Sequence, residues 1–438
     1  MKLEGTSIKQ DFLKFIIPSV IAQWVFTLYT MIDGIFVARG VSEIALTAVN
    51  ISFPFVAALF SISLLFAVGT SMVVAILLGE GRQKRVNEVF TQNITVLVVV
   101  SLVITAVVLL NLEGFAKFLG ATQGSLPYVK EYIGSLAPFA VAFILSYSFE
   151  ILIKTDGYPQ KATAIVVVGA VMNCILDYLF VIVFHWGVSG AAVATGISQV
   201  FVIVLYLWHF LGPKATLRFT KFRLDLKLIG REFRNGLSSG VTEMSAGIIV
   251  FFFNLAITRY IGEDALVSYT IVSYINSIVV MSMTGIAQGS QPLISYYHGK
   301  KETATCRKLL RYGLISAAVF SLASVAICVF GTKGIVSLFV SAELSELRSY
   351  SANVLRIFSL SFLIAGYNVV VGGYFTSIEY AYSAIIITLA RGFVTLLSAL
   401  ALMIAIFGGR GIWWAPLVSE IMCLVLTAAL FRRYRKRK

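Results

Sequence analysis

Apolar residues along the chain fall into twelve blocks, each separated from the next by a short polar or basic segment. The blocks cover residues 12–38, 46–78, 90–112, 128–153, 162–184, 187–211, 236–261, 265–297, 309–331, 352–376, 382–407 and 411–431. A helix needs about 20 apolar residues to cross the roughly 30 Å hydrocarbon layer of a bilayer. The pattern therefore predicts an all-α polytopic membrane protein with twelve transmembrane helices.

Composition and charge support a membrane location. The chain is 58% hydrophobic and 13% charged, whereas a soluble domain has roughly 25% charged residues. Its net charge of +14 does not indicate nucleic acid, because the basic residues gather in alternate loops. On the side of the termini lie 26 of the 35 Lys and Arg residues, and 8 lie on the other side. The positive-inside rule then places both termini in the cytoplasm. The lipid bilayer is the expected partner of the protein.

Several kinds of enzyme are disfavoured by missing motifs. The four cysteines, Cys174, Cys306, Cys328 and Cys423, are too widely spaced to indicate a disulfide framework or a metal site. The chain has no G-x-x-x-x-G-K-[ST] phosphate loop. "GLSSG" (236–240) fits a hydrolase motif but opens a membrane span instead of a strand–turn–helix. We therefore expect neither an enzyme nor a cofactor, and an ion gradient remains as the energy source.

The second half of the sequence repeats the first at an offset of about 220 residues. "GVSGAAVATGISQ" (187–199) lies over "GGRGIWWAPLVSE" (408–420), and "GEGRQKR" (79–85) over "YHGKKET" (297–303). We predict an N-terminal six-helix lobe at 1–211, a basic cytoplasmic linker at 212–235, and a C-terminal six-helix lobe at 236–438 with a basic tail. Because each half has an even number of spans, the two bundles are parallel repeats, as in many secondary transporters.

Polar groups inside three N-terminal spans are predicted to lie at one depth. Asp33 is in the outer half of the first span, Asp177 is ~10 Å from the outer end of the fifth, and Thr195 is ~12 Å below the outer surface on the sixth. Asn173 and Asp177 are four residues apart, so they project from the same helix face. A charge at this depth costs at least ~2.5–3.5 kcal/mol, which makes it a candidate for function.

The residue types indicate two forms of ion chemistry. Asp33, Asp177, Asn173 and Thr195 offer oxygen ligands for a metal cation such as Na⁺. The two carboxyl groups could instead carry protons, because burial favours their neutral form. The alternative is that Asp177 forms a structural hydrogen bond between helices, for which an uncharged residue would serve.

The other intramembrane charges are open to two interpretations. Glu243 and Glu420 could contact substrate or form a second proton site, or each could belong to a local ion pair with Arg391. Glu150, near the end of the fourth span, is expected to pair with Lys154 at i+4.

Two backbone features are less specific. Pro18 lies inside the first span, where it would act either as a hinge or as a passive kink. "GIAQG" (285–289) is a GxxxG pattern that indicates close helix packing at most.

Four stretches resemble the MATE (multidrug and toxic compound extrusion) family, in particular its bacterial DinF-like and MepA-like branch. They are "FIIPSVIAQWVFTLYTMIDGIFVARGVSEIALTAVNISFP" from Phe15, "LLGEGRQKRVNEV" from Leu77, "MNCILDYLFVIVFHWGVSGAAVATGISQ" from Met172 and "GIAQGSQPLISYYHG" from Gly285. The resemblance covers nearly the whole chain. It implies a V-shaped pair of six-helix bundles that exports organic cations in exchange for Na⁺ or H⁺.

The resemblance also implies roles for individual residues. The family's cation site in the N-terminal lobe falls on Pro18, Asp33, Tyr132, Asn173, Asp177 and Thr195, each occupied by the residue type that the family uses. It favours a hinge role for Pro18, and it places the acid of the seventh span on Glu243.

We therefore predict a secondary active efflux transporter for amphipathic, cationic organic compounds, working by antiport with H⁺ or Na⁺ as a monomer in the bacterial cytoplasmic membrane. The runner-up is a flippase for a lipid-linked oligosaccharide or precursor. An anionic pyrophosphate would call for several Lys or Arg in the spans, whereas only Arg391 is found there. A membrane sensor or scaffold is a third class, but it would not require two carboxylates at one depth.

Overall fold

The computed structural model describes residues 7–41, 43–340 and 343–436, and the last two residues of the predicted basic tail lie outside this part. Within the described residues the chain is helical and contains no β-strand. Twelve of its helical segments are long and apolar enough to cross a membrane. The prediction of an all-α polytopic membrane protein is confirmed.

The N-terminal lobe consists of the elements up to α8. In chain order they are α1 (Ile8–Gly40), α2 (Glu43–Gly79), α3 (Gln83–Leu110), α4 (Leu112–Phe118), α5 (Leu126–Leu136), η1 (Ala137–Phe139), α6 (Ala140–Thr155), α7 (Pro159–Asp177), η2 (Tyr178–Val183) and α8 (Gly187–Leu211). The fourth span is divided, because Pro138 lies in the short 3₁₀ turn η1 between α5 and α6. The end of the fifth span is the π-helix η2, which an apolar block does not distinguish from an α-helix.

The C-terminal lobe consists of the elements from α9 onward. They are α9 (Leu226–Tyr260), α10 (Ala265–Gly299), α11 (Thr303–Phe330), α12 (Thr332–Ser337), α13 (Ser345–Ser359), α14 (Phe362–Ser377), α15 (Ala381–Leu389), η3 (Ala390–Val394), α16 (Thr395–Phe407), η4 (Gly408–Trp413) and α17 (Ala415–Lys436). Here too the fifth span of the lobe contains a π-helix, η3. The tenth span is broken between α13 and α14.

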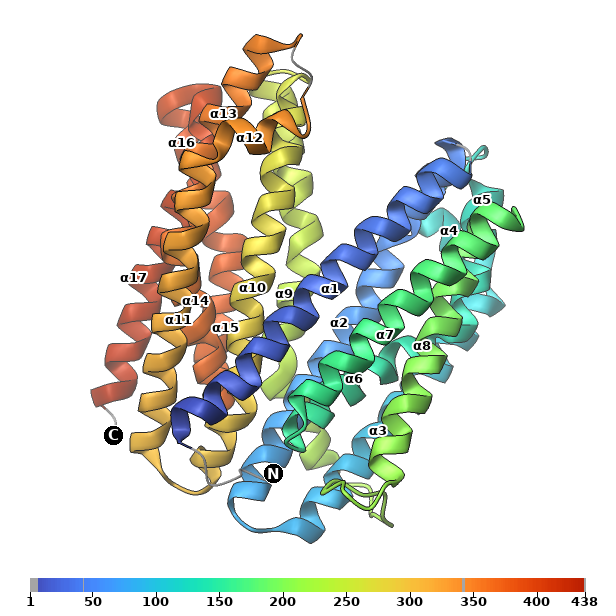
Figure 1. Ribbon diagram of the computed structural model, residues 1–438, viewed down its shortest axis with the longest axis vertical. Coiled ribbons are helices and arrows are strands. Elements are labelled where there is room, and N and C mark those ends of the chain that lie inside the picture. Colours follow the sequence, from blue (N-terminus) through green and yellow to red (C-terminus); the bar gives the residue numbers. More distant parts are fainter. Residues whose placement is uncertain (1–6, 42, 341–342, 437–438) are drawn as a thin grey trace.

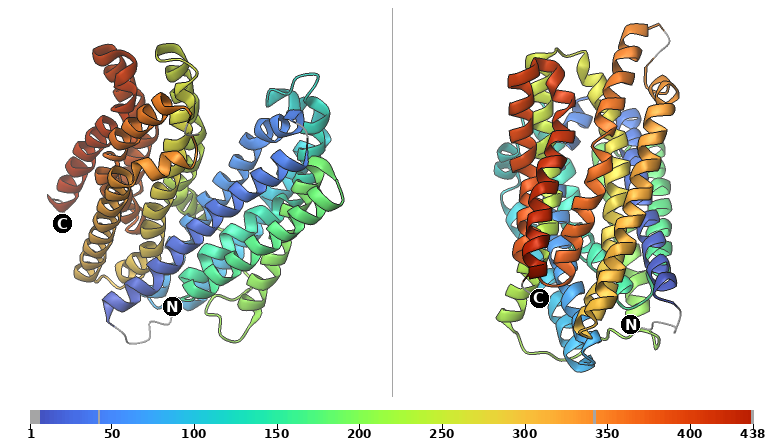
Figure 2. Two further views of the ribbon diagram at one scale, coloured as in Figure 1. Left: turned by 45° about the horizontal axis from the view of Figure 1, so that its top comes forward. Right: turned by 90° about the vertical axis from the view of Figure 1, so that its left-hand side faces the viewer.

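The two lobes form a V that is closed at the end carrying both termini and open at the other end (Figure 1). Figure 2 shows the same separation from a second direction. We call the contact of α1 and α2 with α9 and α10 the seam. Each lobe has its own apolar core, but the first turns of α1 pack into the C-terminal lobe, where Phe12 and Phe15 contact a cluster that includes Leu293 and Tyr374.

The seam is a backbone contact at several glycines. A Cβ added to Gly69 on α2 would lie 2.0 Å from the carbonyl oxygen of Glu232 on α9, and one added to Gly236 would lie 1.6 Å from that of Leu65. Such distances leave no room for a side chain, so the helices approach as closely as in GxxxG packing. "GIAQG" behaves in the same way, because a Cβ on Gly285 would lie 2.8 Å from Val20 Cα of α1. The prediction of close packing there is confirmed.

The segment between the lobes is fastened to the N-terminal lobe. The fully buried Asp156 accepts hydrogen bonds from the backbone N–H of Thr216 (2.9 Å) and Leu217 (3.1 Å) and contacts His209 (2.8 Å). Asp225 caps α9, because its side chain accepts from Leu228 N–H. The predicted linker 212–235 is thus only partly a loop, and its residues from Leu226 onward are the first turns of α9.

Candidate functional site

The two predicted acids, Asp33 and Asp177, lie together in the half of the N-terminal lobe remote from the termini. We call them the acid pair. Asp33 comes from α1, and Asp177 is the last residue of α7, directly before the π-helix η2. Their carboxyl groups are close enough to interact directly. Because π-helical turns widen a helix locally and often occur at functional sites, η2 is consistent with a specialised end to this span.

The acid pair lacks the partners that buried charges need, and of its two members Asp33 is partly buried. Asp177 is completely buried. Within the part of the chain that the structure describes, neither oxygen of Asp177 nor Oδ1 of Asp33 accepts a hydrogen bond. Two adjacent carboxylates repel each other, so they cannot both remain ionised unless a cation lies between them or one of them binds a proton. The arrangement is therefore suited to binding a small cation or a proton.

The other three residues of the predicted cation site surround the acid pair. Asn173 is one turn before Asp177 on α7, and its Nδ2 lies 3.4 Å from Thr195 Oγ1 of α8. Its Oδ1 is buried and has no hydrogen-bond partner among the described residues. Tyr132 of α5 is 8% exposed and lies within electrostatic range of both acids. The structure thus brings all five residues into one region, whereas their role in ion coupling stays a prediction.

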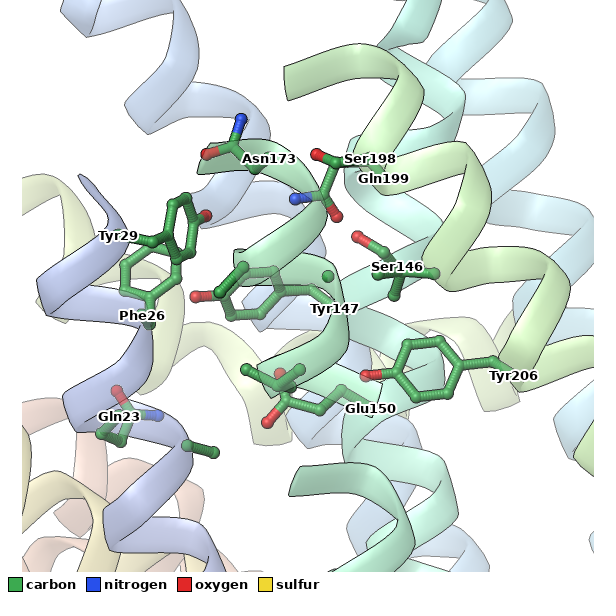
Figure 3. Close-up of a pocket in the computed structure, with 15 residues that line it drawn as sticks. Gln23, Phe26, Tyr29, Ser146, Tyr147, Glu150, Asn173, Ser198, Gln199 and Tyr206 are labelled. Carbon is green, nitrogen blue, oxygen red and sulfur yellow. The ribbon is translucent and has the colours of Figure 1, made fainter. Parts of the chain in front are cut away.

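A cavity extends from Asn173 toward the termini, between α1, α6, α7 and α8 (Figure 3). Polar side chains from all four helices line it, namely Gln23, Tyr29, Ser146, Tyr147, Glu150, Asn173, Ser198, Gln199 and Tyr206. The cavity has a volume of about 40 Å³. That is room for a few water molecules, whereas a drug-sized compound needs at least about 300 Å³.

At the far end of this cavity Glu150 is paired. Lys154 Nζ lies 2.6 Å from Glu150 Oε1, and both side chains are buried. The predicted i+4 pair is confirmed. Since the carboxylate already has a cation within the lobe, Glu150 is less available for ion coupling than the acid pair.

In the C-terminal lobe, Glu420 and Arg391 form an ion pair. Arg391 Nε of η3 lies 2.8 Å from Glu420 Oε1 of α17, and Asn368 Nδ2 of α14 donates to Glu420 Oε2 at 2.7 Å. Of the two interpretations of Glu420, the local pair with Arg391 is the one the structure shows. Glu243 of α9 is separate from this cluster. It is within electrostatic range of Tyr147 in the opposite lobe, and it forms no ion pair within the described residues.

Helix α1 connects the two lobes as well as carrying Asp33. It is one continuous helix through Pro18, whose carbonyl oxygen accepts a hydrogen bond from Thr163 of α7 at 2.8 Å. Toward the other lobe, Gln23 Nε2 donates to Gln288 Oε1 at 3.0 Å. Trp24 Nε1 likewise donates to Ser282 Oγ of α10 at 2.7 Å. Asp33 therefore lies on a helix that is hydrogen-bonded to α7 within its own lobe and to α10 of the other lobe.

Some residues of the site were not predicted from the sequence. Gln23, Phe26 and Tyr29 line the cavity from α1, and their spacing of three residues continues to within one turn of Asp33. That periodicity was available in the sequence as a signal. Tyr147 and Tyr206 had no such signal, since a buried tyrosine is common in any helical core.

The family model described as MatE matches this chain twice, over residues 18–179 and 240–400. The two matches start 222 residues apart, close to the offset of the sequence repeat. Among curated proteins, the chain is 24% identical over 440 residues to the multidrug export protein MepA of Staphylococcus haemolyticus (strain JCSC1435), covering 99% of this chain and 95% of the relative. It is 22% identical over 441 residues to MepA of Staphylococcus aureus (strain MRSA252), covering 99% and 96%.

Solved structures of the same kind share the fold. One is described as the outward-facing conformation of a multidrug resistance MATE family transporter of the MOP superfamily, with a TM-score of 0.92, 21% identity and coverage of 98% of this chain and 96% of that one. Another, a MOP superfamily transporter from Pyrococcus furiosus, has a TM-score of 0.90 at 21% identity with the same coverage. The match of the family model to most of the chain, in two copies that correspond to the two lobes, shows that this multi-pass membrane protein belongs to the MatE family of transporters.

Proposed function

We propose that this protein is a secondary active multidrug exporter, which moves amphipathic organic cations out of the cell while H⁺ or Na⁺ enters through the acid pair. The carrying observation is that the partly buried Asp33 and the fully buried Asp177 lie side by side, with three buried carboxyl oxygens that have no hydrogen-bond partner among the described residues. The export function named for the MepA relatives agrees with this proposal.

The proposed ion site takes its ligands from three helices. With H⁺ as the coupling ion, one proton shared by the acid pair removes the repulsion between the two carboxylates. With Na⁺, Asn173 Oδ1 and Thr195 Oγ1 would complete an oxygen shell. Side chains other than carboxylates are needed for this, because no cluster of three or more Asp, Glu, His or Cys residues suited to a metal occurs in the described residues.

The organic substrate is assigned to the space between the lobes, because the N-terminal cavity is too small for it. With the termini in the cytoplasm, as the basic residues predict, the V opens outward (Figure 1). Entry of one cation across ~150 mV supplies ~3.4 kcal/mol, enough for a substrate gradient of a few hundredfold. The flippase alternative is not favoured, since Arg391, the basic residue predicted within a span, is paired with Glu420.

Transport in proteoliposomes tests the proposal. A fluorescent organic cation is loaded, and an inward H⁺ gradient or an inward Na⁺ gradient is imposed in separate experiments. We expect one of the two gradients to drive export, and Asp177→Asn to abolish it while the variant remains folded. Glu113→Gln is the matched control, because Glu113 is an exposed acid outside the spans that pairs with Lys117 and Lys130. Wild-type transport that ignores both gradients, or a fully active Asp177→Asn variant, would refute the proposal.

A further inference from the structure

Another buried acid, Glu232, lies in the seam and belongs to neither the acid pair nor the cavity. It is on the second turn of α9 and only 1% exposed. Its side chain faces Thr70 of α2, across the seam. Neither Glu232 Oε1 nor Thr70 Oγ1 has a hydrogen-bond partner in the described part of the chain. The backbone of Glu232 is the same group that Gly69 approaches most closely, so its burial depends on the two lobes being in contact.

The charged groups around Glu232 are already engaged. Arg231 Nε and Nη2 lie 2.6 and 2.7 Å from the two oxygens of Glu379. Arg85 of α3 is bound to Glu88 and to Asp225. These cations attract Glu232 and the carboxylate of Asp225 repels it. Glu80 is the remaining acid near Arg231.

No ion pair to Glu232 forms among the described residues, although two arginines lie nearby. Burying an ionised carboxylate without such a pair is strongly unfavourable, so the neutral acid is the form that a closed seam accommodates.

We propose that Glu232 is a proton-binding group of the seam, which takes up a proton when α2 and α9 close and releases it when they part. The inference rests on the proposed function, because it requires the lobes to separate at the termini side during transport. The proton comes from the aqueous phase at that side and returns to it, so it adds nothing to the coupling stoichiometry. It makes the ratio of closed to open seam depend on pH.

The direction of the pH dependence follows from which protonation form of Glu232 is favoured in the closed seam and which in the open seam. At low pH the neutral acid stays buried and the seam stays closed. As the pH rises, ionisation favours the state in which water reaches Glu232, and that state has an open seam. One proton changes the ratio of the two states by at most about tenfold per pH unit.

Distances across the seam test this inference without measuring transport. Spin labels are placed at Lys84→Cys and Ala304→Cys, two exposed positions at the termini side of different lobes, after replacement of the four native cysteines. Distance distributions are recorded in nanodiscs between pH 5.5 and 9. The background carries Asp177→Asn, so that titration of the acid pair does not contribute. Glu232→Gln removes the proton site, Glu232→Asp keeps it, and Glu80→Gln is a matched control at an exposed acid.

We expect the long-distance population to grow with pH in the background protein, in Glu232→Asp and in Glu80→Gln. In Glu232→Gln it should stay small at every pH. An unchanged pH response in Glu232→Gln overturns the inference, as does a distribution that is independent of pH in every variant. If these distances are found but the protein with its native Asp177 transports no organic cation in proteoliposomes, the proposed function is contradicted and this inference still stands.

Discussion

At the scale of single residues, Glu379 in the turn between the tenth and eleventh spans combines an unfavourable backbone conformation with a stabilising side-chain contact. Glu379 has φ +58°, a left-handed conformation that favours glycine. Its carboxylate receives two hydrogen bonds from Arg231 and one from Asn235 at 2.8 Å. Glycine would relieve the backbone strain, but it could not make this contact between α9 and the turn.

Replacement of Glu379 separates these two effects. Glu379→Ala and Glu379→Gly both remove the ion pair, whereas only glycine removes the strain. We expect both variants to be less stable than the wild type. The free energy of unfolding of the glycine variant should be higher than that of the alanine variant by about 1 kcal/mol. Thermal unfolding in detergent ranks the stabilities of the wild type and the two variants. Equal stability of the two variants would show that the left-handed backbone carries no cost.

The same ion pair predicts a pH dependence. Burial raises the pKa of Glu379, but the hydrogen bonds and charge of Arg231 outweigh it, so its pKa lies below the ordinary value. A depressed folded pKa means that the stabilisation is complete above the unfolded pKa of about 4.3 and is lost as the pH falls through the folded value. The stability difference between wild type and Glu379→Gln should therefore be constant from pH 7 to 5 and shrink below about pH 4. A difference that instead vanishes between pH 7 and 5 would exclude the ion pair as its source.

Site residues differed in how far the sequence could reveal them. Asp33, Asn173, Asp177 and Thr195 could be grouped from the sequence because helix rise converts position into depth, and the structure brings them together. Glu232 was missed because a charge-rich stretch was assigned to a linker, whereas it forms the start of α9. Composition could not reveal that the partner lobe would cover this stretch.

At the scale of helices, the closest contact is made where two backbones meet. Gly230 and Gly236 lie six residues apart on α9, but only Gly236 touches the opposite lobe. A Cβ on Gly236 would lie 1.6 Å from Leu65 O, while one on Gly230 would meet nothing within 4 Å. The pair therefore offers a matched comparison within one helix.

Alanine at these two positions should have opposite effects. Gly230→Ala is expected to leave stability unchanged or raise it by up to about 1 kcal/mol, because alanine is the better helix former. Gly236→Ala is expected to lower it by about 1–3 kcal/mol, because α2 and α9 must move apart. Apparent melting temperatures in detergent compare the two. Equal effects would show that the seam tolerates a side chain at Gly236.

Element types were predictable to different extents. Twelve spans followed from apolar length alone, and all twelve are found. The short helices α4 and α12 and the π-helices η2 and η3 were not predicted, because they depend on packing and local hydrogen bonding and not on apolar length. The start of α9 was placed about ten residues too late for the same reason.

At the scale of the whole molecule, α1 is one of the helices that must change partners if the lobes move as proposed. Its hydrogen bonds Gln23–Gln288 and Trp24–Ser282 join it to α10 in the present state. If transport requires the lobes to separate at the termini side, a covalent link at this place will stop the cycle.

Cross-linking provides the measurement. We expect a Gln23→Cys/Gln288→Cys pair, bridged by a short cleavable reagent, to lose at least about 90% of transport and to regain it after cleavage. A Ser71→Cys/Thr155→Cys pair is the control, since those two hydroxyls lie 2.7 Å apart within one lobe. Its cross-link should leave transport largely intact. Full activity of the bridged Gln23→Cys/Gln288→Cys protein would show that α1 and α10 stay together throughout the cycle.

The glycine contacts of the seam also bear on how this protein can diverge in evolution. A contact between two backbones uses no side-chain identity, so its geometry depends on the absence of a Cβ at a few positions such as Gly69 and Gly236. The surrounding residues can be exchanged for others of similar polarity without altering how the lobes meet. A family built in this way can keep its architecture while most of its sequence drifts, as the TM-score of 0.92 at 21% identity illustrates. The few glycine positions of the seam, in contrast, would accept almost no substitution.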